Sequence, residues 1–346
     1  MSACAPFARH PDGRALYRQR HLNADGREVL LYSYTDAPRA PVGAALERAK
    51  QSSALRWHPL RQEWAVYAGA RQARTFKPAS AFDPLAPMVP GGAATEIPFA
   101  DFEIAVFENR FPALSATAQA RGRCEVVAFG PEAEGGLASL AQDRRVLLVS
   151  AWIDRYAALF ELGLEYVLPF ENRGDEAGVT LHHPHGQIYG FSFVPSVQQK
   201  AADAFAGGYD LAAEMAGWRE DYLIAEAGGI AAFAPPFARF PYETWLAPRT
   251  PRRGPWEFSG EEIDGFAYLL GEMTRRYDAH FGRPTPYMLS LHAAPRGSGP
   301  FQFSAQFYPL LRDAARVKYL AAVEQATGVF TVDVAPEAAA RTLRGL

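Results

Sequence analysis

The stretch that most constrains the fold is residues 170–195, at whose centre the sequence reads His-Pro-His-Gly-Gln. Alternate side chains of an extended strand point to the same face, so we expect His183, His185 and Gln187 to lie together. Two imidazoles and an amide on one face suit a phosphate ester better than an apolar core. The alternative is a chance cluster of histidines on an edge strand, which Pro184 would mark.

A polar loop with several glycines precedes this strand. It contains Asn172, Gly174, Gly178 and Thr180. Backbone N–H groups in such a loop can face an anion. Within the strand, Gly186 leaves room for a close approach. The loop and the strand therefore predict the same kind of ligand, a phosphate.

Composition excludes several classes of protein. The 346 residues carry a formal net charge of -3, so no basic field favours nucleic acid or an anionic membrane. No apolar run is long enough to span a bilayer, and the N-terminal segment lacks a signal-peptide core. Two cysteines without a Cys-x-x-Cys motif argue against a cysteine-based zinc site and fit a reducing compartment. We expect a cytoplasmic protein that needs no cofactor.

Two helical patterns divide the chain into similar halves. Apolar side chains recur at alternating steps of three and four in residues 146–160 and again in residues 263–277, which predicts a helix with one buried face in each half. A strand follows each helix, near residues 166–170 and 287–289. A candidate capping box precedes each helix, formed by Ser139 and Gln142 in the first half and by Ser259 and Glu262 in the second.

The second half lacks the pair of histidines. Equal spacing from Tyr166 and from Tyr287 places Ser304 and Gln306 at the positions that match the two histidines. We therefore predict an α+β fold of two related halves, of which only the first is catalytic. The predicted division is a lead-in at residues 1–55, a catalytic half at residues 56–195 and a second half at residues 196–346.

Two arginines follow the strand expected near residues 63–67. Arg71 and Arg74 come directly after it, and guanidinium groups bind phosphate oxygens in a bidentate way. For the pair taken alone, two solvated surface arginines would be an equally good interpretation. Because the chain also contains the histidine strand, we expect the two arginines to contact the phosphates of a ligand.

At these residues the chain resembles the galactose-1-phosphate uridylyltransferases, the transferase branch of the histidine-triad superfamily. The resemblance is strongest in the pattern FEN-K/R-G followed by HPHGQ, which residues 170–174 and 183–187 carry in full. It implies an antiparallel half-barrel sheet with flanking helices, in a homodimer whose sites are shared across the subunit boundary. It also implies that UMP passes from UDP-glucose to galactose 1-phosphate through a uridylyl-histidine.

The resemblance also implies roles for individual residues. Arg110 stands where the family usually has an aspartate beside the nucleoside, and Val323 where it usually has a tyrosine beside the hexose, which leaves the base and the sugar open. The nucleotide-binding set is Arg71, Arg74, Phe107, Asn109, Arg110, Phe111, Asn172, Gly178, Thr180 and Gln187. The sugar-binding set is Lys318, Tyr319, Val323 and Glu324.

The chemistry of nucleotidyl transfer agrees with this assignment. A neutral His185 would attack the α-phosphorus, since a free imidazole titrates at about 6.5. The leaving sugar phosphate, with a second pKa of about 6, needs no general acid. Gln187 cannot donate a proton to it but can hydrogen-bond a non-bridging oxygen. We expect His183 to orient its neighbour rather than to attack.

Family metal sites are expected to be absent. The cysteines of the family's zinc site are replaced in the segment that begins at Asp83, and its further histidine is replaced near Ala133. Of the iron-type site only His292 remains, since Ala201, Ser304 and Gln306 stand at or near the other ligand positions. A single histidine cannot close a tetrahedral site.

Two other functions remain open from the sequence. A nucleotide-sugar or dinucleotide phosphorylase, or an adenylyltransferase, would use the same histidine on different substrates, and Arg110 and Val323 keep this alternative open. A nucleotide-binding protein without turnover is the second alternative. The intact HPHGQ motif argues against it, because decay rarely spares only the residues that carry the chemistry.

Overall fold

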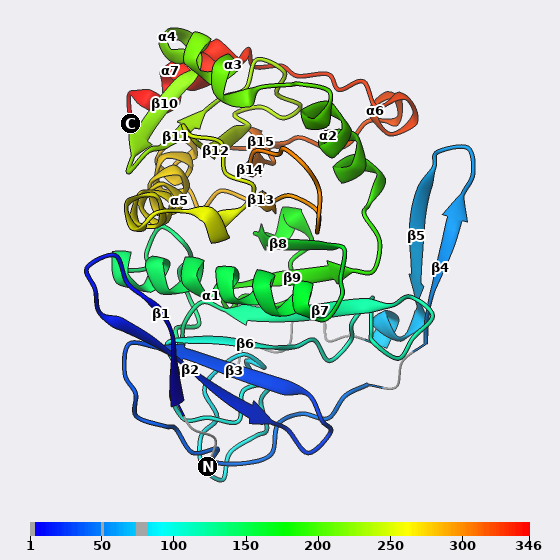
Figure 1. Cartoon of the computed structure of the whole chain (residues 1–346), viewed down its shortest axis with the longest axis vertical. Coiled ribbons are helices and arrows are strands. Elements are labelled where there is room, and N and C mark those ends of the chain that lie inside the picture. The colour runs from blue at the N-terminus through cyan, green and yellow to red at the C-terminus, as the bar shows by residue number, and fades with distance from the viewer. Residues whose placement is uncertain (1–3, 50–51, 74–81) are drawn as a thin grey trace.

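A twelve-stranded antiparallel sheet organises the computed structural model, which describes residues 4–49, 52–73 and 82–346. The strand order is β1-β2-β3-β6-β7-β9-β8-β13-β14-β12-β11-β10 (Figure 1). The first seven strands are β1 (Cys4–Arg9), β2 (Ala15–Leu22), β3 (Glu28–Ser33), β6 (Ile104–Glu108), β7 (Gly122–Ala128), β9 (His185–Phe191) and β8 (Tyr166–Arg173). The other five are β13 (Tyr287–His292), β14 (Ser304–Pro309), β12 (Thr244–Pro248), β11 (Ile230–Phe233) and β10 (Leu223–Ala227).

The strand order is mirrored about the central pair β8 and β13. Going outwards, β9, β7, β6 and β3 on one side correspond to β14, β12, β11 and β10 on the other. The two related halves predicted from the sequence therefore form one continuous sheet. The strands β1, β2 and β3 of the expected lead-in segment extend the same sheet at one edge.

Two long helices, α1 (Gln142–Glu161) and α5 (Gly260–Phe281), cover one face of the sheet and contact each other. Each buries the apolar residues whose spacing predicted it, such as Tyr156 in α1 and Tyr277 in α5, both fully buried. The other α-helices of the described residues are α2 (Ser196–Ala206), α3 (Leu211–Gly217), α4 (Arg219–Tyr222), α6 (Ala322–Thr327) and α7 (Pro336–Arg344). No helix of the described residues is long and apolar enough to cross a membrane.

Only one of the two expected capping boxes forms. Ser259 accepts from the backbone N–H of Glu262, whose carboxylate accepts in return from the N–H of Ser259. The predicted box at the start of α1 is wrong, because Ser139 bonds the backbone of Gly136 instead. Helix α1 begins at Gln142 without a side-chain cap.

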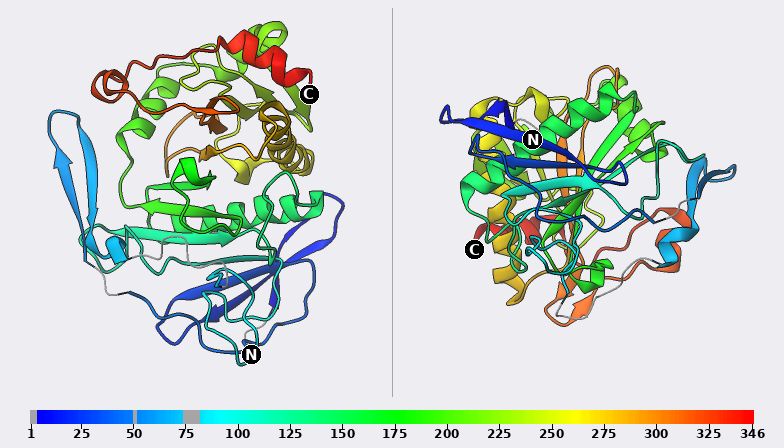
Figure 2. Two further views of the ribbon diagram at one scale, coloured as in Figure 1. Left: turned by 180° about the vertical axis from the view of Figure 1, so that it is seen from behind. Right: turned by 90° about the horizontal axis from the view of Figure 1, so that it is seen from below.

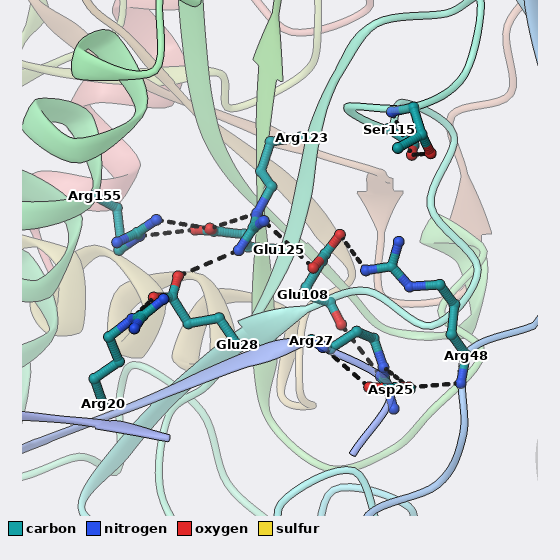
Figure 3. Close-up of polar contacts among 11 residues, drawn as sticks. Arg20, Asp25, Arg27, Glu28, Arg48, Glu108, Ser115, Arg123, Glu125 and Arg155 are labelled. Atoms are coloured by element: carbon teal, nitrogen blue, oxygen red, sulfur yellow. Dashed lines mark hydrogen bonds and ion pairs between the residues drawn. The ribbon is translucent and has the colours of Figure 1, made fainter. Parts of the chain in front are cut away.

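A buried ion pair fixes α1 to the sheet. Arg155 of α1 donates to both oxygens of Glu125 on β7, at 2.9 and 2.8 Å, and Arg123 donates to the same carboxylate (Figure 3). Burial alone would raise the pKa of Glu125, and the charges of Arg155 and Arg123 more than offset it, so the net shift is downward. Removing one partner of such a pair leaves a buried charge and costs about 3–5 kcal/mol.

The correspondence between the halves differs by two residues from the one counted along the sequence. The count matched Ser304 with His183, whereas the structure begins β14 at Ser304 and β9 at His185. Strand β13 spans six residues and β8 spans eight, while the loops that follow them are equally long. The next strand therefore begins two residues earlier, counted from the start of the preceding strand, in the second half than in the first. Ser304 therefore corresponds to His185, and Gln306 to Gln187.

A two-stranded hairpin, β4 (Ser53–His58) and β5 (Glu63–Ala68), stands out from the body of the molecule (Figures 1 and 2). It exposes the large side chains of Trp57, Leu60 and Trp64. The guanidinium of Arg61 at its tip donates to the backbone oxygen of Gln325 in α6. The small pair β15 (Leu311–Asp313) and β16 (Arg316–Val317) completes the fold.

Candidate active site

Strand β9 presents its alternate residues to the face of the sheet that α1 and α5 leave open. His185 and Gln187 line two cavities there, of about 160 and about 200 Å³. Both cavities also share Arg71 and Thr180. Gly186 points the other way, where an added Cβ would lie 3.0 Å from the oxygen of Phe170 and close to a buried phenylalanine ring. The expectation that Gly186 makes room for a ligand is therefore wrong: it makes room for packing inside the protein.

One hydrogen bond fixes the orientation of the His185 imidazole. Its Nδ1 lies 2.8 Å from the backbone oxygen of His183, which can only accept, so Nδ1 carries the proton. The lone pair is then on Nε2. Burial, the largest cause, lowers the pKa of His185 below its ordinary value of 6.5, and this keeps the ring neutral near pH 7.

His183 is held from both sides and does not face the cavities. Its Nδ1 lies 2.7 Å from Oδ2 of Asp83, and its Nε2 lies 2.8 Å from the backbone oxygen of Gly130. Burial alone would raise the pKa of Asp83. The hydrogen bond and electrostatic interaction with His183 more than offset this rise, so the pKa lies below its ordinary value and the carboxylate is ionised near pH 7. Both ring nitrogens of His183 are therefore engaged within the protein, and the residue acts as a support under His185.

These residues do not fit a metal ion. A histidine ligand turns a free ring nitrogen to the metal, and both nitrogens of His183 already have partners in the protein. The described residues contain no group of three or more His, Cys, Asp or Glu side chains that could hold a metal. The carboxylate of Asp83 occupies the position where the related pattern has its first cysteine, and it bonds His183 directly.

The smaller cavity gathers the residues predicted beside the nucleoside. Phe107, Asn109, Arg110 and Phe111 all line it. Asn109 accepts the N–H of Phe111 at 2.8 Å, which fixes the turn after β6. Arg110 donates to the backbone oxygen of Glu47 at 2.7 Å and lies over the ring of Phe111, with its guanidinium carbon 5.1 Å from the ring centroid.

The larger cavity is polar and gathers the loop residues. Asn172, Gly178 and Thr180 line it, and Gly174 lies outside its lining. Gly178 has a left-handed backbone, with φ at 74°, which favours glycine. Its N–H donates to the oxygen of Asp175 inside the loop. That N–H is therefore not available to an anion, contrary to the expectation from the sequence.

Arg71 stands where the two cavities meet. Its Nη1 lies 3.2 Å from the hydroxyl of Tyr189 and 3.2 Å from the backbone oxygen of Phe111. No Asp or Glu oxygen of the described residues lies within 4.0 Å of its charged nitrogens. Its charge is thus directed into the cavities rather than neutralised. Arg74 lies outside the described residues.

The residues expected to contact the sugar lie apart from both cavities. Lys318 and Glu324 are buried and paired with each other. Glu324 also accepts the N–H groups of Ala321 and Thr331, at 2.8 and 3.0 Å. Tyr319 is 76% exposed and, like the exposed Val323, faces solvent. None of the four lines a cavity that contains His185.

Sequence reasoning missed a carboxylate in the smaller cavity. Glu96 lines it, is 7% exposed and accepts from Nη1 of Arg27 at 2.8 Å. Burial raises the pKa of Glu96, and the charge of Arg27 opposes that rise. Glu96 lies in a loop rich in proline and glycine, where no local pattern reveals that its side chain turns inwards.

Comparison with known proteins agrees with this geometry. Residues 43–195 match the family model described as galactose-1-phosphate uridyl transferase, N-terminal domain. The galactose-1-phosphate uridylyltransferase of Streptomyces lividans is 36% identical, over 93% of this chain and 95% of that protein. That of Thermotoga maritima is 33% identical, over 84% of this chain and 97% of that protein. The chain belongs to the galactose-1-phosphate uridylyltransferase family.

Membership places the chain among nucleotidyl-transferring enzymes, and solved structures agree on the fold. A structure described as that of a uridylyltransferase superposes with a TM-score of 0.72 at 25% identity, covering 84% of this chain and 97% of that one. An ADP-glucose phosphorylase from Arabidopsis thaliana superposes with a TM-score of 0.66 at 22% identity, over 85% of this chain and 99% of that one, which shows a shared fold alone. The histidine-triad fold and the family predicted from the sequence are confirmed.

Proposed function

We propose that this family member transfers UMP from UDP-glucose to galactose 1-phosphate by double displacement through a uridylyl group on His185. The observation that carries the proposal is the hydrogen bond from Nδ1 of His185 to the oxygen of His183. It leaves the lone pair of Nε2 free, beside two cavities that meet at this ring. One cavity suits a nucleoside and the other the phosphates.

The two half-reactions balance without a proton donor. In the first, Nε2 of His185 forms a bond to the α-phosphorus, and the bond from that phosphorus to the bridging oxygen breaks. Glucose 1-phosphate leaves with the electron pair. In the second, a phosphate oxygen of galactose 1-phosphate forms the new bond and the P–N bond breaks. The ring gains positive charge in the intermediate, which the backbone oxygen of His183 stabilises.

Gln187 and Arg71 supply the stabilisation of charge on phosphorus. The amide of Gln187 lines both cavities and forms no side-chain hydrogen bond with the described residues, so its N–H groups are available to a non-bridging oxygen. The guanidinium of Arg71 reaches the same space and binds phosphate oxygens. Both interactions strengthen as negative charge builds up in the transition state.

The hexose would be contacted by a second copy of the chain. Lys318, Tyr319, Val323 and Glu324 lie outside the cavities of their own chain, and the same region exposes apolar side chains such as Leu320. The projecting hairpin β4–β5 exposes further aromatic side chains. A homodimer formed through these surfaces would bring one chain's residues 318–324 to the other chain's site.

A phosphorylase that acts through the same histidine is the second candidate. The guanidinium of Arg110 and the carboxylate of Glu96, both in the nucleoside cavity, favour it. Arg110 stands where the family pattern has a carboxylate, so the contacts to base and ribose differ from that pattern. In such an enzyme, inorganic phosphate would replace galactose 1-phosphate as the acceptor.

One experiment tests the proposal directly. Incubation with UDP-glucose alone should release glucose 1-phosphate and add the mass of one uridylyl group to the peptide that contains His185. The adduct should be acid-labile and base-stable, as a phosphoramidate is. His185→Gly should lose it, and His182→Gly, a matched change at an exposed neighbour, should keep it. An adduct that persists in His185→Gly would exclude His185 as the nucleophile. Release of glucose 1-phosphate from ADP-glucose in the presence of phosphate, without release from UDP-glucose, would favour the second candidate.

A further inference from the structure

A third cavity, of about 490 Å³, lies in the second half of the sheet. Its volume is within the range of roughly 300–1,000 Å³ typical of small-molecule sites. Strand β14 lines it with Ser304, Gln306 and Tyr308, and β13 adds His292. Because the strand order is mirrored about β8 and β13, this is the counterpart of the space in front of β9.

The residues of this cavity repeat part of the catalytic pattern without its nucleophile. Gln306 and Tyr308 correspond to Gln187 and Tyr189, whereas a serine corresponds to the attacking histidine. Each half also places one arginine against its tyrosine. Arg71 donates to the Tyr189 hydroxyl, and the guanidinium carbon of Arg239 lies 5.4 Å from the centroid of the Tyr308 ring.

A continuous chain of hydrogen bonds crosses the cavity floor in one direction. The amide of Gln198 lies 3.4 Å from Nδ1 of His292, and the other ring nitrogen lies 3.5 Å from the hydroxyl of Tyr308. Tyr308 donates to the oxygen of Gln306, whose nitrogen donates to Ser304 at 2.9 Å. Within the described part of the chain, the Ser304 proton and the second amide proton of Gln306 find no acceptor.

The charged groups around this cavity favour an anion. The Arg239 guanidinium has no Asp or Glu oxygen within 4.0 Å among the described residues. Glu243 is 1% exposed and is fully engaged, because it accepts the N–H groups of Arg239 and Phe240 and the indole N–H of Trp245. The cavity therefore offers unused donors and one positive charge, but no unengaged carboxylate.

The walls of the cavity are aromatic. Phe205 of α2 lies 4.7 Å, centroid to centroid, from Phe301, and Phe237 lies 5.3 Å from Trp245 of β12. All four side chains line the cavity, together with Tyr209. Aromatic side chains stack on planar rings with little dependence on which ring is bound.

We propose that this cavity binds a nucleotide, with its base against the aromatic walls and its phosphate at Arg239, Ser304 and Gln306. The bound nucleotide is not transferred. The Ser304 hydroxyl has no base to accept its proton, since the imidazole of His292 is bonded to Gln198 and Tyr308 instead.

Calorimetric titration with UMP, and separately with AMP, tests the proposal on the full-length chain. With UMP the wild-type protein should bind two nucleotides per chain, one at each half, and AMP should bind at least in this cavity. Ala201→Trp places a large side chain in the cavity from α2 and should remove one binding event. Ala206→Trp, on the same helix but outside the cavity lining, should retain both. Inorganic phosphate alone should bind far more weakly, because it cannot use the aromatic walls.

Arg239→Gln gives a second readout at an exposed side chain, where folding is not at risk. It should weaken the second event at least about tenfold, the size expected for one lost charge-assisted hydrogen bond. Isotherms that are equal for Ala201→Trp and Ala206→Trp with both nucleotides, or that Arg239→Gln leaves unchanged, would overturn the proposal. Its failure is separate from that of the transferase proposal, since uridylylation of His185 is measured without reference to this cavity.

Discussion

Asp83 and His183 are hydrogen-bonded across 100 positions of sequence, with Oδ2 of the acid 2.7 Å from Nδ1 of the ring. The second ring nitrogen bonds the oxygen of Gly130 at 2.8 Å. The backbone oxygen of this same histidine then receives the proton of His185. The orientation of the His185 ring thus depends on a carboxylate that this ring does not touch.

Replacing the carboxylate should destabilise the protein and misplace the nucleophile. Asp83→Ala should lower the free energy of unfolding by about 1–3 kcal/mol, because the buried ring loses a charged acceptor. It should also slow transfer more than it weakens substrate binding. Urea unfolding and steady-state kinetics measure the two effects. Asp101→Ala, at a side chain that is 71% exposed, is the control; equal losses in both variants would contradict a supporting role.

The same pair makes stability depend on pH in the acid range. The pKa of Asp83 is lowered on folding, so its contribution is fully present above the unfolded value of about 3.9. It should be lost as the pH falls through the lower folded value. Melting temperatures of the wild type and Asp83→Asn should therefore converge below about pH 4. A difference that persists unchanged at pH 3 would mean that the ionised carboxylate is not what stabilises the fold.

Metal chelators should leave the protein unchanged. Elemental analysis of the purified protein should show no stoichiometric zinc or iron, because both nitrogens of His183 are engaged. Treatment with EDTA should shift neither the melting temperature nor the rate of transfer. About one metal ion per chain, lost together with activity on chelation, would contradict this prediction.

Sequence patterns predicted the parts of the site that are local in the chain. The shared face of His185 and Gln187 could be predicted because both lie within one strand, whereas His183 precedes that strand and lines neither cavity. The place of Asn109 and Phe111 was implied by the family resemblance. Glu96 could not be predicted, since its role depends on how a loop folds back over a distant strand. Nor could Asp83 be predicted as the partner of a histidine 100 residues away. The two-residue shift between the halves required strand lengths that only the structure gives.

Arg71 should hold the phosphates of the nucleotide sugar. Arg71→Ala should weaken the binding of UDP-glucose at least tenfold, because one charge-assisted contact is worth about 1.5–3 kcal/mol. Arg74→Ala should have the same effect if its side chain reaches the same phosphates. Calorimetry provides the measurement, and Arg121→Ala, at an exposed arginine outside the cavities, provides the control. If Arg71→Ala and Arg74→Ala both bind UDP-glucose as tightly as the wild type does, the two arginines do not belong to the binding site.

The rate of transfer should fall in acid as His185 becomes protonated. Because burial lowers the pKa of His185 below 6.5, the acid limb of kcat/KM for UDP-glucose should have its midpoint below that value. Formation of the uridylyl adduct in a single turnover should show the same midpoint. A midpoint above 7 in both measurements would mean that another group controls the reaction.

Gln187 should act on both half-reactions to a similar extent. In the proposed reaction its amide contacts the transferred phosphoryl group in both half-reactions, so Gln187→Ala should raise each barrier by roughly 2.7–4 kcal/mol, as for an oxyanion-hole donor. Binding of UDP-glucose should change much less, because the contact strengthens only as charge develops. Rapid-quench measurement of uridylylation and of its reversal separates the two steps, and Gln199→Ala on the surface of α2 is the control. If only one half-reaction slows, the amide contacts one sugar phosphate rather than the phosphorus that is transferred.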